Sequence, residues 1–129
     1  MQLKSLLFAA LCLLTIAACK SHDHDDTDNE APVLTISTPT ENEVVSGTVH
    51  VEFTVTDQSL HEMEVKVTKD SDGAELYKVN PVVHDVTDYE FHEHFNPGVA
   101  AETAVTLTVT VSDHSDQTTV KTVKFKVKP

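Results

Sequence analysis

Histidine is the residue type in this sequence with the clearest capacity for chemistry. Eight histidines occur among 129 residues, a share well above that of an ordinary globular domain. Neutral imidazole is the commonest protein ligand for metals such as zinc and copper. The histidines therefore indicate a divalent-metal site, provided that the fold brings several of them within reach of one ion.

Two of these histidines, His92 and His94, lie two residues apart in a predicted strand. Alternate residues of a strand face the same side, about 6.5 Å apart along it, so both imidazoles could bind one ion. Their parity is opposite to that of Phe91 and Phe95, which predicts that they face solvent. The alternative is that they are two solvated polar residues on an outer sheet face.

Three more histidines, His61, His84 and His114, lie in or beside predicted turns. In an immunoglobulin-like sandwich the loops before the third, fifth and seventh strands gather at one end. The three imidazoles, with the carboxylates of Asp57, Asp85 and Asp113, could therefore meet at one rim, close to the start of the strand that carries the other pair. The alternative is that each histidine is a loop residue in water. The predicted ligands for zinc or copper are His61, His84, His92, His94 and His114.

The remaining polar motifs have simpler explanations. His22 and His24 alternate with aspartates in an acidic stretch, which we interpret as a solvated spacer. His50 stands among outward-facing threonines and is expected to be a surface residue. The run Asp70-Ser-Asp-Gly73 departs from the spacing of an EF-hand loop, and a hairpin turn explains it.

Catalytic motifs are missing from the sequence. No serine lies in a Gly-x-Ser-x-Gly elbow, and there is no His-Glu-x-x-His helix. The adjacent pairs His61-Glu62 and His92-Glu93 point to opposite faces of their strands, so they could not act together as ligand and base. We therefore expect a protein that is not an enzyme.

The elements that must position the histidines are β-strands. Alternating valine and threonine side chains, separated by short turns, predict half-buried strands. The predicted strands are 33–38, 49–55, 63–67, 74–79, 89–95, 105–111 and 123–127. Such a pattern favours an all-β fold, an antiparallel two-sheet immunoglobulin-like sandwich of about seven strands, over residues 32–129.

The amino-terminal residues 1–18 have the layout of a secretory signal, with Lys4 before an apolar run that is too short to span a bilayer. The end of this segment, Ile16-Ala17-Ala18-Cys19, resembles the lipobox of bacterial lipoproteins. The resemblance implies cleavage before Cys19 and attachment to a membrane through lipid on that cysteine. Residues 19–31 are acidic and lack large apolar side chains, which predicts a flexible tether.

Two further stretches resemble known bacterial proteins. Residues 39–57 are similar to the opening of many bacterial immunoglobulin-like domains. The motif His92-Glu93-His94, with the Thr/Val strand after it, resembles a family of Bacteroidota lipoproteins that carry an uncharacterised immunoglobulin-like domain. The final turn, residues 113–118, lacks the glycine and asparagine usual in that family. The resemblance implies a sandwich fold and a cell-envelope location, and it brings no activity with it.

The charge of the chain limits its partners. The formal net charge is −12, with 21 acidic and 9 basic side chains, so we expect no binding to nucleic acid. Lys20 follows the lipidated cysteine, which favours the outer membrane. The expected partners are the membrane, a divalent metal and an envelope protein. Two functions stay open: a metal-binding lipoprotein, or a structural or adhesive module that binds no metal.

Overall fold

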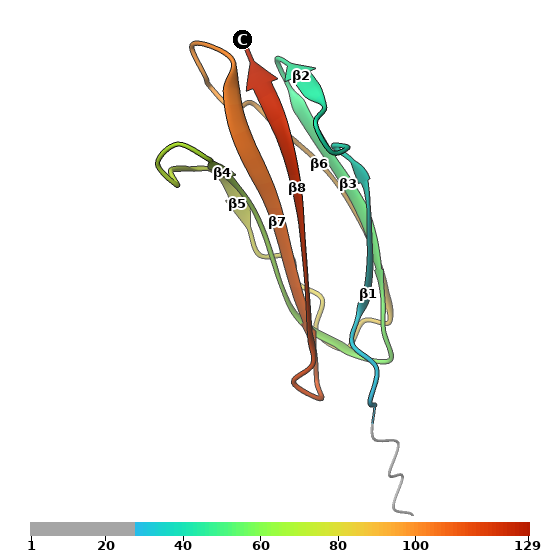
Figure 1. The fold of residues 1–129 in the computed structure, drawn as a ribbon. Helices are drawn as coiled ribbons and strands as arrows, with labels where there is room; N and C mark the ends of the chain where they lie inside the picture. Colours follow the sequence, from blue (N-terminus) through green and yellow to red (C-terminus); the bar gives the residue numbers. More distant parts are fainter. Residues whose placement is uncertain (1–27) are drawn as a thin grey trace, which may run out of the picture.

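The computed structural model describes residues 28–129, so the predicted signal segment, Cys19 and most of the predicted tether lie outside the described residues. Within this range, eight strands follow one another (Figure 1): β1 (Val33–Thr38), β2 (Val44–Ser46), β3 (Val49–Thr56), β4 (Leu60–Lys69), β5 (Glu75–Val79), β6 (Asp88–Phe95), β7 (Thr103–Asp113) and β8 (Thr118–Lys128). No helix between residues 28 and 129 is long and apolar enough to cross a membrane.

The strands form two facing sheets. One sheet has the order β1-β3-β6, and the other has the order β2-β8-β7-β4-β5 (Figure 1). The chain crosses between the sheets several times, and the hairpins β4–β5 and β7–β8 each lie within the larger sheet. The predicted fold class, an all-β immunoglobulin-like sandwich, is confirmed.

The first predicted strand is present as β1, and an additional strand, β2, lies after it in the other sheet. β1 pairs antiparallel with β3, whereas β2 pairs parallel with β8, so that Val45 lies opposite Val127. The chain crosses between the sheets at Pro39, after a cis peptide bond, and at the turn that follows. The structure therefore has one more strand than the seven predicted, and one parallel pair in an otherwise antiparallel sandwich. The three-residue β2 is too short to show an alternating pattern.

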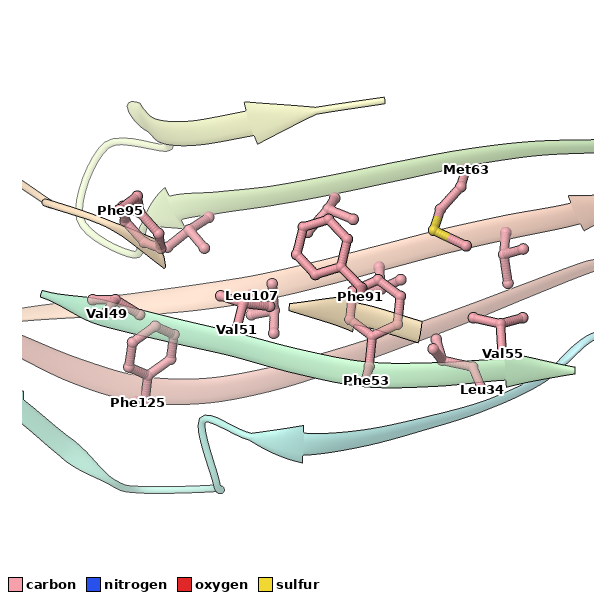
Figure 2. Packing of buried hydrophobic residues seen from close by; sticks show 14 of the residues in the cluster. Leu34, Val49, Val51, Phe53, Val55, Met63, Phe91, Phe95, Leu107 and Phe125 are labelled. Carbon is pink, nitrogen blue, oxygen red and sulfur yellow. The ribbon is translucent and has the colours of Figure 1, made fainter. Parts of the chain in front are cut away.

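The core lies between the sheets and is built from one face of each strand. In β3, buried Val49, Val51, Phe53 and Val55 alternate with residues that are exposed or half-buried. Figure 2 shows these side chains packed with residues of the opposite sheet. The buried hydrophobic residues all lie between positions 34 and 127, so a chain of residues 20–129 retains every strand and the whole core. No cysteine occurs after Cys19, so the described domain has no disulfide.

The β4–β5 hairpin confirms the prediction made for residues 70–73. Gly73 has a φ of +72°, a conformation that suits glycine. The Gly73 N–H donates to the Lys69 carbonyl over 2.9 Å, and Asp72 Oδ1 accepts the Ala74 N–H over 3.0 Å. The Asp72 carboxylate therefore stabilises the turn, whereas the Asp70 carboxylate accepts a hydrogen bond from the Thr106 hydroxyl over 2.6 Å and pairs with Lys124.

Candidate functional site

Three of the predicted ligands meet at one end of the sandwich. His61 lies at the start of β4, His84 in the β5–β6 connection and His114 in the β7–β8 turn. One ring nitrogen from each lies within 4.8 Å of the other two. The ring centroids are 4.5 Å apart for His61–His114, 4.6 Å for His84–His114 and 5.3 Å for His61–His84. We call these three residues the rim cluster.

Backbone hydrogen bonds to Ser59 and Leu60 hold the rim cluster together. The Leu60 N–H donates to the Val86 carbonyl, and the Asp85 N–H donates to the Leu60 carbonyl, each over 2.9 Å. The His114 N–H donates to the Ser59 carbonyl over 3.1 Å. Leu60 is fully buried, so the segment that collects the three loops is itself fixed by the core. The imidazoles are therefore placed by rigid backbone and not by free loops.

A carboxylate completes the rim cluster. Asp85 Oδ1 lies 3.0 Å from His114 Nε2, and Asp85 Oδ2 lies 3.5 Å from His84 Nε2. Asp85 has a φ of 62°, the left-handed conformation that aspartate tolerates better than most residues. Three imidazoles and one carboxylate form a donor set that suits four-coordinate zinc. Ligand distances of about 2.0–2.2 Å require the side chains to close inward by small rotations.

The other two predicted ligands lie in a second group, on the outer face of the three-stranded sheet. His94 pairs directly with His50 across β3 and β6, and His92 pairs with Glu52. Ring nitrogens of His50, His92 and His94 lie within 4.8 Å of one another, and all three side chains are exposed. His92 Nε2 is 3.3 Å from Glu52 Oε1. We call the three histidines the sheet-face cluster.

The two clusters cannot share one ion. His50 is near the beginning of β3, and the Asp57–Ser59 turn that leads to His61 follows the end of that strand. Six residues of extended chain separate His50 from Thr56, which is about 20 Å. The strand that carries His92 and His94 does begin near the rim, where Asp88 pairs with Thr56, but the two histidines occupy its second half. His50, which was expected to be an isolated surface residue, instead belongs to the group.

A third group, at the same end as the rim cluster, consists of carboxylates. Asp28, Asp57 and Asp113 each place one oxygen within 4.8 Å of the others. We call them the acidic cluster. Asp113, the last residue of β7, is 1% exposed, whereas His114, the first residue of the turn that follows, is exposed. Burial, together with the carboxylates of Asp28 and Asp113, raises the pKa of Asp57 above its ordinary value of 3.8.

Asp57→Asn is expected to stabilise the domain at neutral pH in buffer without divalent metal ions. The raised pKa means that the folded state binds a proton more tightly than the unfolded state does, so ionisation of Asp57 opposes folding. The melting temperature should rise by about 2–4 °C at pH 7, and the gain should vanish as the pH falls below about 3.8. Thermal unfolding followed by circular dichroism, with EDTA present, checks this.

The matched control for that measurement is Asp72→Asn. Asp72 also accepts a backbone N–H two residues ahead, as Asp57 does from Ser59, but it lies outside the acidic cluster. The control variant should melt within about 1 °C of the wild-type chain. An equal rise in melting temperature in both variants would contradict the conclusion that burial and the carboxylates of Asp28 and Asp113 destabilise the ionised form of Asp57.

Comparisons with known proteins bear on the fold alone. No family model matches the chain, and no curated protein matches it. Among solved structures, an engineered protein is similar over 76% of this chain, with a TM-score of 0.55 and 17% identity. The chain spans 20% of that protein's length. The CARDB domain of the PF1109 protein from Pyrococcus furiosus, in complex with di-metal ions, has a TM-score of 0.43 and 19% identity, over 81% of this chain and 98% of that domain.

The fold supports a coarse functional statement. At such identities a structural likeness shows a shared fold, and many unrelated functions occur on one fold. An immunoglobulin-like sandwich suggests a structural or interaction module. Any more specific function has to come from the side chains of the rim, sheet-face and acidic clusters.

Proposed function

We propose that this chain is a lipid-anchored protein of the bacterial outer membrane whose immunoglobulin-like domain binds one zinc or copper ion at the rim cluster. The observation that carries the proposal is the approach of three imidazole nitrogens, one from the start of β4 and two from loops, to within 4.8 Å of one another. Imidazole suits both zinc and copper. The lipobox-like sequence that ends at Cys19 supports the membrane anchor.

The rim cluster is a better metal site than the sheet-face cluster for a structural reason. His61 is half-buried, and the cluster is fixed by backbone hydrogen bonds to a buried segment. In the sheet-face cluster, the rings of His92 and His94 stack 4.9 Å apart at 5°, and all three histidines are exposed. Less side-chain freedom is lost when a pre-ordered site binds an ion. We therefore expect the sheet-face cluster to bind a second ion more weakly.

Asp85 acts in the rim cluster as a fourth ligand or as the group that orients two imidazoles. A carboxylate that accepts a hydrogen bond from a metal-bound histidine fixes the tautomer and raises the basicity of the ring. The short contacts of Asp85 with His84 and His114 fit either role. With no thiol in the described domain, nitrogen and oxygen are the available donors.

Calorimetric titration with zinc and copper near neutral pH tests the proposal. The chain of residues 20–129, with His22→Ala and His24→Ala to remove the histidines of the tether, should bind one ion with a dissociation constant of about 1 μM or tighter. A weaker second event should follow from the sheet-face cluster. Absence of any binding at about 10 μM protein, or binding that needs His22 and His24, would leave the non-metal interaction module as the better account.

A further inference from the structure

The acidic cluster contains a buried carboxylate oxygen that has no partner. Asp113 is the one buried charged residue among residues 28–129. Its Oδ1 accepts the N–H groups of Ser115 and Gln117, each over 2.8 Å, and closes the β7–β8 turn. Its Oδ2 is buried with no hydrogen-bond partner. A buried charged atom left unpaired costs a substantial part of the domain's stability, so a missing partner is indicated.

The surroundings of Asp113 indicate that this partner is a cation. Carboxylate oxygens of Asp28 and Asp57 lie within 4.8 Å of an Asp113 oxygen and of each other. Among the residues that the structure describes, no lysine forms an ion pair with any of the three, although four lysines pair with other acidic residues. Three carboxylates gathered without a counter-charge repel one another, and a divalent ion would remove that repulsion.

We propose that the acidic cluster is a calcium site, in which Asp113 Oδ2 and one oxygen each from Asp28 and Asp57 bind the ion. Calcium takes six to eight oxygen ligands at about 2.3–2.6 Å. Two ligands on opposite sides of the ion are then about 4.8 Å apart, so three oxygens that lie within 4.8 Å of one another could contact the same ion. Asp28 and Asp57 also line a shallow surface cleft, through which water could supply the remaining ligands.

The site joins the amino-terminal segment to the body of the domain. Asp28 Oδ1 accepts the Gln58 side-chain N–H over 3.3 Å, and the Asp28 carbonyl accepts the Gln117 side-chain N–H over 3.0 Å. Asp57 and Asp113 come from β3–β4 and from the end of β7. Calcium bound here would clamp the last part of the predicted tether to two loops of the sandwich. The affinity expected for such an exposed envelope module is about 0.1–1 mM.

Thermal unfolding of the chain of residues 20–129 with and without calcium tests the site. At about 10 mM CaCl2 the melting temperature should rise by about 5–15 °C above that in EDTA. The same concentration of MgCl2 should give a smaller shift, because magnesium demands a tighter octahedral shell. An equal shift with magnesium would show general screening of the acidic chain and would overturn the proposal.

Variants separate the calcium site from folding and from the rim cluster. Asp57→Asn keeps the oxygen that accepts the Ser59 N–H, so it should fold, and its calcium-induced shift should fall below about 2 °C. Asp28→Asn should weaken the response, whereas Asp72→Asn should leave it unchanged. A full response in Asp57→Asn or Asp28→Asn would contradict the three-carboxylate site. His84→Ala should retain the calcium response, which distinguishes this result from any failure of zinc binding.

Discussion

His84→Ala is expected to weaken zinc binding at least about 100-fold relative to the parent chain of residues 20–129. Loss of one imidazole leaves His61, His114 and Asp85 to hold the ion. Outer-shell partners alone change metal affinity by about 10–100-fold, so loss of a direct ligand should cost at least the upper end of that range. His84 has 57% of its side chain exposed, and its replacement should leave the fold intact.

Competition with a chromophoric zinc chelator measures the zinc dissociation constants of the parent chain and of His84→Ala. The matched control is His50→Ala, which removes one exposed histidine from the sheet-face cluster. The control should abolish the weaker second binding event and leave the tighter one within about two-fold of the parent value. Equal affinity of the tighter event in His84→Ala and the parent chain would rule out the rim cluster as its site.

Phe53→Ala is expected to lower the free energy of unfolding by about 3–5 kcal/mol. Phe53 is 1% exposed, and its ring stacks on Phe91 directly across the β3–β6 pair, with centroids 4.6 Å apart. The change removes both the buried area and this aromatic contact. A domain of this size has a free energy of unfolding of about 5–15 kcal/mol, and no disulfide restrains its unfolded state, so the substitution should remove a large share of its stability.

Urea unfolding of the parent chain and of Phe53→Ala gives the two free energies. Val120→Ala is the control, because Val120 is 56% exposed and should change the free energy of unfolding by less than about 0.5 kcal/mol. Phe53→Leu should fall between the two variants, since it keeps most of the buried volume. A decrease in the free energy of unfolding of less than about 1 kcal/mol in Phe53→Ala would contradict the conclusion that the Phe53–Phe91 pair stabilises the core.

The fold could be predicted from the sequence because apolar and polar side chains alternate along most of the strands. Val49 to Val55 and Val105 to Val111 show a strict period of two, and the structure buries those valines. The outward direction of His92 and His94 followed from the same parity. Strand β2 could not be predicted from the sequence. Its three residues show no alternation of apolar and polar side chains, and it forms because it pairs with β8.

The candidate sites could be predicted only where they depend on the spacing of residues within a strand or on the order of the loops along the chain. Knowing that three alternate loops meet at one end was enough to expect His61, His84 and His114 together. The place of His50 depends on its pairing with His94, and register between strands that are 44 positions apart in sequence is not a local property. Asp57 and Asp113 were expected at the same rim, but the acidic cluster was not, because Asp28 was assigned to the tether.

The additional strand β2 also determines how the domain would respond to a mechanical force. The chain enters the described domain at one end of the sandwich, and its last residue lies at the other end (Figure 1). The parallel pairing of β2 with β8 places hydrogen bonds between the second strand and the last strand. Tension along the long axis would shear these bonds simultaneously and would not open them one at a time. A domain built in this way would resist stretching between its two ends.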